Sequence, residues 1–262
     1  MLKKSRVAAQ AAETKWNISD RLVQQMTSDS ATSLADSHPE LITKSPIELF
    51  DMIFTQRMFE HLQEQFELYA HRDANSPVFT ATVTGVRQFI GILLLSGYHC
   101  LPCEGDYWST ADDLGCSLVM KTMSRSRFQE LKRLCHIADN QALGTSKVAK
   151  IQPLYDSLNN CLLQFGVFDS MLSIDESMVP YYGHHSAKMF IRGKPIRFGY
   201  KIWMLCSSDG YPYQAAIYCR KTDRPQHVTL GKHVVTSLAD CIPNKAEHEL
   251  YFDNFLCPIH CC

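Results

Sequence analysis

The sequence lacks the long apolar stretch that a membrane-spanning helix requires. Its longest apolar run, residues 89–95, is far shorter than the ~18 residues needed to cross a bilayer. The basic residues near the start, Lys3, Lys4 and Arg6, are not followed by the apolar core of a secretory signal. We therefore expect a protein that is neither inserted in a membrane nor secreted.

An excess of either charge is also missing. The 26 Lys and Arg residues against 27 Asp and Glu residues give a net charge of −1. Overall charge therefore gives no indication of nucleic-acid binding, and such a function has to rest on a local basic patch. With 262 residues, 45% of them hydrophobic, the chain is long enough for one large or two ordinary domains with a packed core.

A regular cysteine framework is absent, although the chain contains 11 cysteines. Their number is odd, their spacing is irregular and no secretory signal precedes them, so we expect reduced thiols rather than disulfides. Cys100 and Cys103 have the spacing of half a zinc site, but no second pair follows at zinc-finger distance. The Cys-rich tail, residues 257–262, could ligate a metal only with partners from elsewhere, and a disordered end is the simpler interpretation.

Hydrophobic periodicity predicts a disordered arm followed by a helical domain. Residues 1–44 are rich in Ser, Ala, Thr and Gln with weak periodicity, which is typical of disorder. Residues 45–168 are predicted to be all-helical, beginning at a capping box formed by Ser45 and Glu48. We expect the helix at residues 85–96 to be buried on most sides. Its apolar positions include Phe89, Ile90, Leu93 and Leu94.

From residue 169 onward the pattern changes to that of a sheet with a crossover helix. The predicted elements are a strand at 171–174, a hairpin of strands at 198–207 and 213–219 about the turn Asp209-Gly210, a helix at 227–239 and a strand at 249–252. The predicted fold class is therefore α+β. An all-helical domain precedes an α/β domain at residues 169–256, and a divergent tail follows.

Two acids come directly after short predicted strands: Asp175 follows the first strand and Asp253 follows the last. If those strands are parallel neighbours, both carboxylates lie at one edge of the sheet, where ligands gather. Carboxylate oxygens suit Mg²⁺ or Mn²⁺, and two such ions ~3.5–4 Å apart can clamp the attacking and leaving oxygens of a phosphoryl transfer. The alternative is that both acids are turn or cap residues.

A basic segment without any acidic residue follows the first of these acids. Within residues 188–201 the cations, interleaved with aromatic residues, are Lys188, Arg192, Lys194, Arg197 and Lys201. They would offset the repulsion between an acidic site and a DNA backbone, and they could hold phosphates without reading sequence. The alternative is a solvated edge strand, where Lys protects against aggregation.

These segments resemble the piggyBac transposases and the host proteins derived from them. Residues 173–183 (SIDESMVPYYG), 188–201 (KMFIRGKPIRFGYK) and 250–255 (LYFDNF) resemble two blocks of the family's catalytic core. Upstream, the segments FIGILLLSGY, DYWS, MSRSRF and HIADN resemble its helical domain. The resemblance covers residues 45–255, and several blocks in a consistent order make it specific.

The resemblance implies an RNase H-like core that holds divalent metal ions, Mg²⁺ or Mn²⁺, on three aspartates. In the family, water and then a DNA 3′-hydroxyl attack phosphodiesters, so that an element is excised and inserted at TTAA sites. The first two aspartates correspond to Asp175 and Asp253, which would make both of them catalytic and metal-binding residues. The implied partners are DNA and a second copy of the chain, with no small-molecule substrate, and the implied location is the nucleus.

The same resemblance implies an incomplete active site. The family's third aspartate lies well beyond the second, and its Cys-rich, zinc-binding domain lies further on, so we expect neither here. From Leu256 the sequence is expected to diverge from the family, and His184 stands where the family usually has an arginine. The predicted protein is thus a transposase derivative that is catalytically incomplete. The alternatives are a non-catalytic DNA-binding or dimerising protein, and a truncated product without a separate function.

Overall fold

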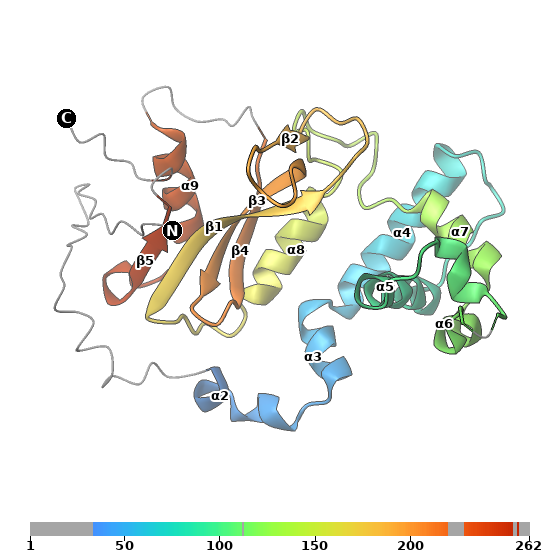
Figure 1. Cartoon of the computed structure of the whole chain (residues 1–262), viewed down its shortest axis with the longest axis horizontal. Helices are drawn as coiled ribbons and strands as arrows, with labels where there is room; N and C mark the ends of the chain where they lie inside the picture. Colours follow the sequence, from blue (N-terminus) through green and yellow to red (C-terminus); the bar gives the residue numbers. More distant parts are fainter. Residues whose placement is uncertain (1–33, 112, 220–227, 254–255, 257–262) are drawn as a thin grey trace. The chain divides into compact units, whose positions relative to one another are not determined.

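The computed structural model describes residues 34–111, 113–219, 228–253 and 256, which divide into two compact units (Figure 1). Residues 50–154 form a helical unit. The described residues on either side, 34–49 and those from 155 onward, form a second unit built on a β-sheet. The protein is therefore a mixture of helices and sheet, as its sequence predicts. Among the described helices, none is both long and apolar enough to cross a membrane.

The helices of the helical unit begin at signals that are readable in the sequence. The elements are α3 (Pro46–Ile53), which starts in the other unit, α4 (Gln56–Arg72), α5 (Val83–Tyr98), η2 (Glu104–Trp108), α6 (Ser117–Thr122) and α7 (Arg125–Leu134). The predicted capping box is present before α3, because the Ser45 amide donates to Glu48 Oε2 at 2.8 Å and the Glu48 amide donates to Ser45 Oγ at 3.4 Å. Ser124 caps α7 by accepting from the Arg127 amide at 3.3 Å.

The core of this unit lies between α4, α5 and α7. Phe59, Phe66 and Leu131 are fully buried there, and α5 contributes a single face. The prediction that α5 is buried on most sides is wrong, since Leu93 is 38% and Leu94 56% exposed. Because α5 packs on one side only, part of its continuous apolar run is exposed to water.

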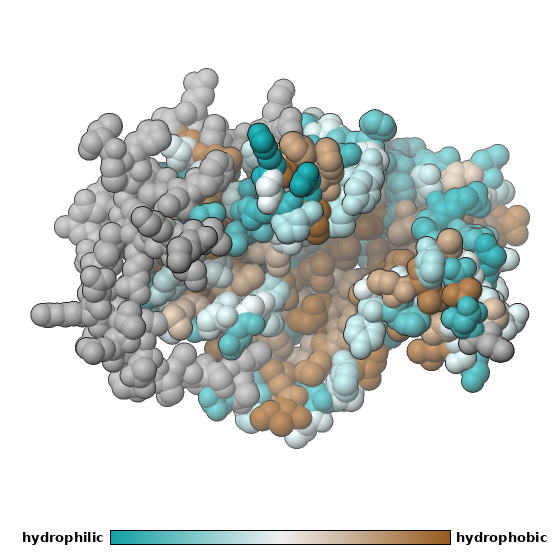
Figure 2. All heavy atoms as spheres, in the orientation of Figure 1, coloured by the Kyte–Doolittle hydropathy of each residue, from teal (hydrophilic) through white to brown (hydrophobic). Residues whose placement is uncertain are grey.

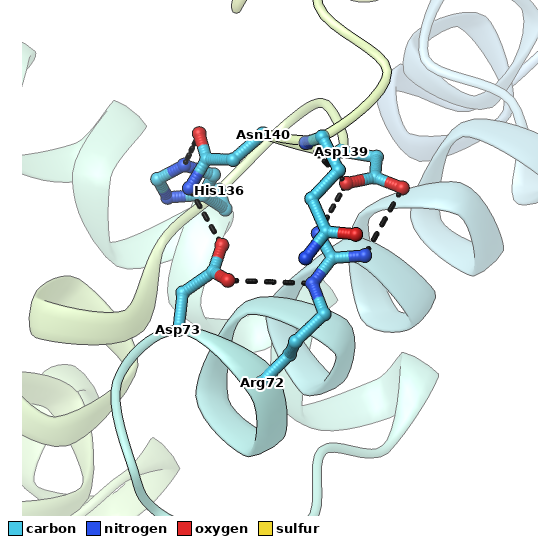
Figure 3. A network of polar contacts seen from close by, with 6 residues as sticks. Arg72, Asp73, His136, Asp139 and Asn140 are labelled. Atoms are coloured by element: carbon cyan, nitrogen blue, oxygen red, sulfur yellow. Dashed lines mark hydrogen bonds and ion pairs between the residues drawn. The ribbon is translucent and has the colours of Figure 1, made fainter.

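Polar side chains fasten the segment after α7 to the end of α4 (Figure 3). The Arg72 guanidinium pairs with the Asp139 carboxylate, and the Asn140 amide donates to Asp73 Oδ2 at 2.7 Å. His136 Nε2 lies 3.0 Å from Asn140 Oδ1, which completes the network. The hydrogen bond from Arg72 lowers the pKa of the Asp139 carboxyl. This network joins residues that are 67 positions apart in the sequence, and it therefore links the C-terminal end of α4 to the segment after α7.

The second unit is organised around one five-stranded sheet. Its strands are β1 (Met171–Pro180), β2 (Met189–Phe190), β3 (Phe198–Ser207), β4 (Pro212–Ile217) and β5 (Glu249–Phe252). The order is β2-β3-β1-β5, with β4 also paired to β3. β1 is antiparallel to β3 and parallel to β5. The bounds of β3 and β5 are those predicted, and Gly210, with φ +90°, makes the predicted turn between β3 and β4.

Helices α8 (Gln152–Leu162) and α9 (Leu230–Ala239) pack against this sheet. Val234 and Leu238 of α9 join the sheet core. Asn159 of α8 donates to the Ala215 carbonyl at 3.0 Å and accepts from the Ala215 amide at 2.9 Å, so its side chain satisfies the edge of β4. The sequence predicts α8 as part of the helical domain, whereas its residues from Tyr155 onward belong to the sheet unit.

The predicted disordered arm falls mostly on residues 1–33, which lie outside the described residues. Its described remainder forms α2 (Leu34–Ser37) and η1 (Pro39–Thr43). His38 Nε2 lies 3.0 Å from the Phe165 carbonyl, within the same unit. This tertiary contact helps to order residues 34–44, whose composition predicts disorder.

Candidate functional site

Asp175 lies in the middle of a strand rather than at its end. β1 continues to Pro180, and Asp175 pairs with Met204 of β3. The prediction that the strand stops at residue 174 is therefore wrong. The reason is that β3 supplies an antiparallel partner for β1 from Leu172 to Pro180, which satisfies the backbone of a segment whose sequence is no longer apolar.

Asp253 directly follows β5, the parallel neighbour of β1. In the register of these strands, Ser173 lies opposite Tyr251 and Ile174 opposite Phe252. The residues that follow this last pair are Asp175 and Asp253, and both are exposed. The prediction that the two strands are parallel neighbours is confirmed, whereas the metal-binding role of the two aspartates stays a prediction.

A third acid, Glu176, follows Asp175 in β1 and is held by two lysines. The Asp175 and Glu176 carboxyl groups lie close enough to influence each other. The Glu176 carboxylate lies 2.8 Å from Lys194 Nζ and 3.7 Å from Lys201 Nζ. The Lys201 ammonium also lies 3.7 Å from the centroid of the Trp203 ring, and its side chain is only 9% exposed. Glu176 thus compensates a buried cation.

The charges in this cluster shift one another's pKa values. Desolvation raises the pKa of Asp175, and the neighbouring Glu176 carboxylate adds to that effect. Although burial opposes it, the hydrogen bond from Lys194 and the charge of Lys201 lower the pKa of Glu176. The hydrogen bond to Glu176, followed by the charges of Glu176, Asp175 and Asp253, raises the pKa of Lys194. The Lys194 ammonium therefore lies in the field of all three carboxylates.

The five predicted DNA-binding cations do not lie in equivalent surroundings. Arg192 and Arg197 are exposed on the hairpin formed by β2 and β3. Lys188 Nζ donates to the carbonyls of Tyr182 and Gly183 at 3.2 and 3.0 Å. The remaining two, Lys194 and Lys201, form the ion pairs with Glu176. The spacing of the five cations in the sequence does not distinguish the exposed ones from those in ion pairs. A signal for the ion pairs is the acid Glu176, which lies next to a segment that contains cations and no acids.

The donor chemistry of the Asp175 and Asp253 edge suits a hard divalent cation such as Mg²⁺ or Mn²⁺. Two carboxylates from adjacent parallel strands supply oxygen ligands. Within the described residues, no group of three or more His, Cys, Asp or Glu side chains is arranged to hold a metal ion. The two carboxylates therefore suit Mg²⁺ or Mn²⁺, and they supply part of the ligands that such an ion requires. Cys100 and Cys103, which are both free and exposed, also belong to no such group of three among the described residues.

Comparison with known proteins connects this geometry with a family. The sequence profile described as Transposase IS4 matches residues 45–261, which is most of the chain. Among curated proteins, piggyBac transposable element-derived protein 3 of Homo sapiens is 30% identical over 250 residues, and piggyBac transposable element-derived protein 2 of Homo sapiens is 31% identical over 218 residues. The chain belongs to the piggyBac-type transposase family.

The matches with the piggyBac relatives cover most of this chain but less than half of each human protein. The alignments cover 94% and 80% of this chain but only 42% and 36% of the two human proteins. The chain thus spans less than half the length of these curated relatives. The family match continues to residue 261, so the resemblance does not end at Phe255 as predicted.

A solved piggyBac structure shows the same fold. The cryo-EM structure of the piggyBac transposase synaptic complex with hairpin DNA superposes with a TM-score of 0.64, at 20% sequence identity. The similarity covers 79% of this chain and 50% of that chain. The mixed helical and sheet architecture is therefore that of a piggyBac transposase. The predicted homodimer and nuclear location stay predictions.

Proposed function

We propose that this chain is a DNA-binding derivative of a piggyBac-type transposase, and that its sheet is the opening of an RNase H-like catalytic core. In this proposal, Asp175 and Asp253 are two of the carboxylates of a metal-dependent site for DNA strand cleavage and transfer. The supporting observation is the parallel register of β1 and β5, whose last pair, Ile174 and Phe252, is followed on both strands by an aspartate.

The charges around this edge support a role with a phosphodiester. A divalent ion bound by Asp175 and Asp253 would stabilise the charge that develops on phosphate oxygens. Arg192 and Arg197 are exposed and could contact the DNA backbone. Glu176 holds the Lys194 ammonium at 2.8 Å, which keeps a cation beside the acidic edge. The site can therefore receive a polyanion despite its carboxylates.

We expect this chain by itself to bind DNA without cleaving it. A two-metal site needs more oxygen ligands than two side chains supply. In the described part of the chain, two aspartates share this edge and no cluster of three metal-binding side chains is present. DNA binding by the exposed arginines does not depend on a complete metal site.

Two assays test this function together. Binding of duplex DNA is followed by fluorescence anisotropy at several salt concentrations, and nicking is followed on gels with Mg²⁺ or Mn²⁺. We expect binding whose salt slope falls by about one to two when Arg192 and Arg197 are both changed to Ala. We expect no metal-dependent nicking.

The controls decide between binding and catalysis. Asp209→Asn, in the exposed turn between β3 and β4, is the matched control for Asp175→Asn. Nicking that Asp175→Asn abolishes and Asp209→Asn retains would show that the chain is an active nuclease. A wild-type chain that does not bind DNA at low salt would refute the proposed function altogether.

A further inference from the structure

The end of the sheet at β2 exposes large aromatic side chains to water. Tyr182 is 82%, Phe190 52% and Phe198 44% exposed. Figure 2 shows hydrophobic and hydrophilic atoms intermixed over the part of the sheet unit where Figure 1 places β2. We call this surface, formed by Tyr182, Phe190 and Phe198, the hairpin face. A group of exposed aromatic residues on one surface indicates a binding site, because leaving them in water costs free energy.

Two rings of the hairpin face, those of Phe190 and Phe198, are held in position. Phe190 and Phe198 lie directly opposite each other in the β2–β3 ladder, with ring centroids 4.8 Å apart. Lys188 Nζ lies 5.4 Å from the centroid of the Phe198 ring and donates to the Tyr182 carbonyl at 3.2 Å. The lysine therefore ties the Tyr182 backbone to the ring pair. A surface that is ordered in this way loses little conformational entropy when a flat ligand stacks on it.

The charge around the hairpin face is positive. Residues 177–201 contain no Asp or Glu. Arg192 and Arg197 are exposed in the turn between β2 and β3, which is closed by the hydrogen bond from the Ile191 amide to the Arg197 carbonyl at 2.9 Å. An occupant that complements this surface carries both anionic groups and flat apolar faces.

We propose that the hairpin face binds an unpaired DNA strand. Its bases stack on Phe190, Phe198 and Tyr182, and its phosphates contact Arg192 and Arg197. Duplex DNA hides its base faces within the helix, so it can use the arginines but gains little from the exposed rings. This inference rests on the proposed function in one respect, since it takes DNA as the partner.

The experiment compares two labelled DNA probes with the full chain. One is an oligo(dT) strand of about 20 nucleotides, and the other is a mixed-sequence duplex of about 20 base pairs. The variants are Phe190→Ala, Phe198→Leu and Tyr182→Ala, each checked by circular dichroism and thermal unfolding. Tyr182 is the most exposed of the three, so its variant remains informative if a ladder variant fails to fold. Tyr98→Ala, at a 91% exposed tyrosine of the helical unit, is the matched control.

Each ring variant is expected to weaken oligo(dT) binding by about 5- to 150-fold, from the range of single base–aromatic stacks. Duplex binding should change by less than about twofold, and the salt slope should be unchanged because no charge is removed. Tyr98→Ala should have no effect on either probe. The arginine double variant should weaken the binding of both probes.

Four results would overturn the inference. Folded ring variants with unchanged oligo(dT) binding would refute the stacking role while wild-type DNA binding upheld the proposed function. Equal losses for both probes would also refute preference for an unpaired strand. Concentration-dependent self-association that the ring variants abolish, without any effect on oligo(dT), would assign the face to a protein contact. A wild-type chain that binds neither probe would refute the proposed function as well.

Discussion

Glu176→Gln tests whether the carboxylate between Asp175 and Ser177 stabilises the sheet by compensating a buried lysine. The Glu176 and Lys201 side chains are 11% and 9% exposed, and their charged atoms lie 3.7 Å apart. The substitution keeps the size of the side chain and removes its charge. The Lys201 ammonium beside Trp203 then loses the attraction of the Glu176 carboxylate.

The expected cost can be worked from these distances. At an effective dielectric constant of about 20, two charges 3.7 Å apart attract by about 4 kcal/mol before desolvation is counted. Removing one partner of a buried pair typically costs about 3–5 kcal/mol. Lys194 adds little, because its side chain is 41% exposed. We expect Glu176→Gln to lower the free energy of unfolding by about 2–4 kcal/mol.

Urea unfolding followed by circular dichroism measures this cost. Asp240→Asn is the control, since its carboxylate is 65% exposed and pairs with Lys245 at 2.9 Å, so its loss should cost less than about 1 kcal/mol. A double-mutant cycle with Lys201→Met should show that the double variant costs less than the sum of the two single changes. A cost below about 0.5 kcal/mol for Glu176→Gln, or additive changes, would refute the reasoning.

Two further predictions concern the backbone of the same sheet. Gly199→Ala should destabilise the chain by at least about 1–3 kcal/mol in urea, because an added Cβ would lie 1.9 Å from the Val179 carbonyl oxygen; a midpoint equal to that of wild type would contradict the close approach. Asp169 accepts from the Ser208 amide at 3.0 Å, and despite opposing burial the Ser208 hydroxyl lowers its pKa. A carboxyl whose pKa is depressed stabilises the fold above its ordinary value of about 3.9, and this stability is lost as the pH falls through the folded pKa. Urea midpoints between about pH 6 and pH 3 should therefore fall more steeply for wild type than for Asp169→Asn, and parallel curves would exclude this linkage.

Local signals in the sequence were sufficient for many elements. The capping box at Ser45 and the turn at Gly210 depend on residues a few positions apart, so their chemistry is legible without a tertiary partner. The strand at residues 249–252 was predicted with its observed bounds. By contrast, the prediction that β1 ends before Asp175 failed because a polar segment becomes a strand when a long partner, here β3, pairs with it.

In the candidate site, too, some features follow from the local sequence and others depend on tertiary contacts. The sequence by itself determined that Asp175 and Asp253 follow apolar segments and that a basic, acid-free segment lies between them. Only the tertiary structure decided that β1 and β5 are parallel neighbours, and that Lys194 and Lys201 pair with Glu176 while Arg192 and Arg197 remain exposed. The physical reason is that strand pairing and charge pairing join residues distant in the chain, and no local periodicity specifies which distant groups will meet.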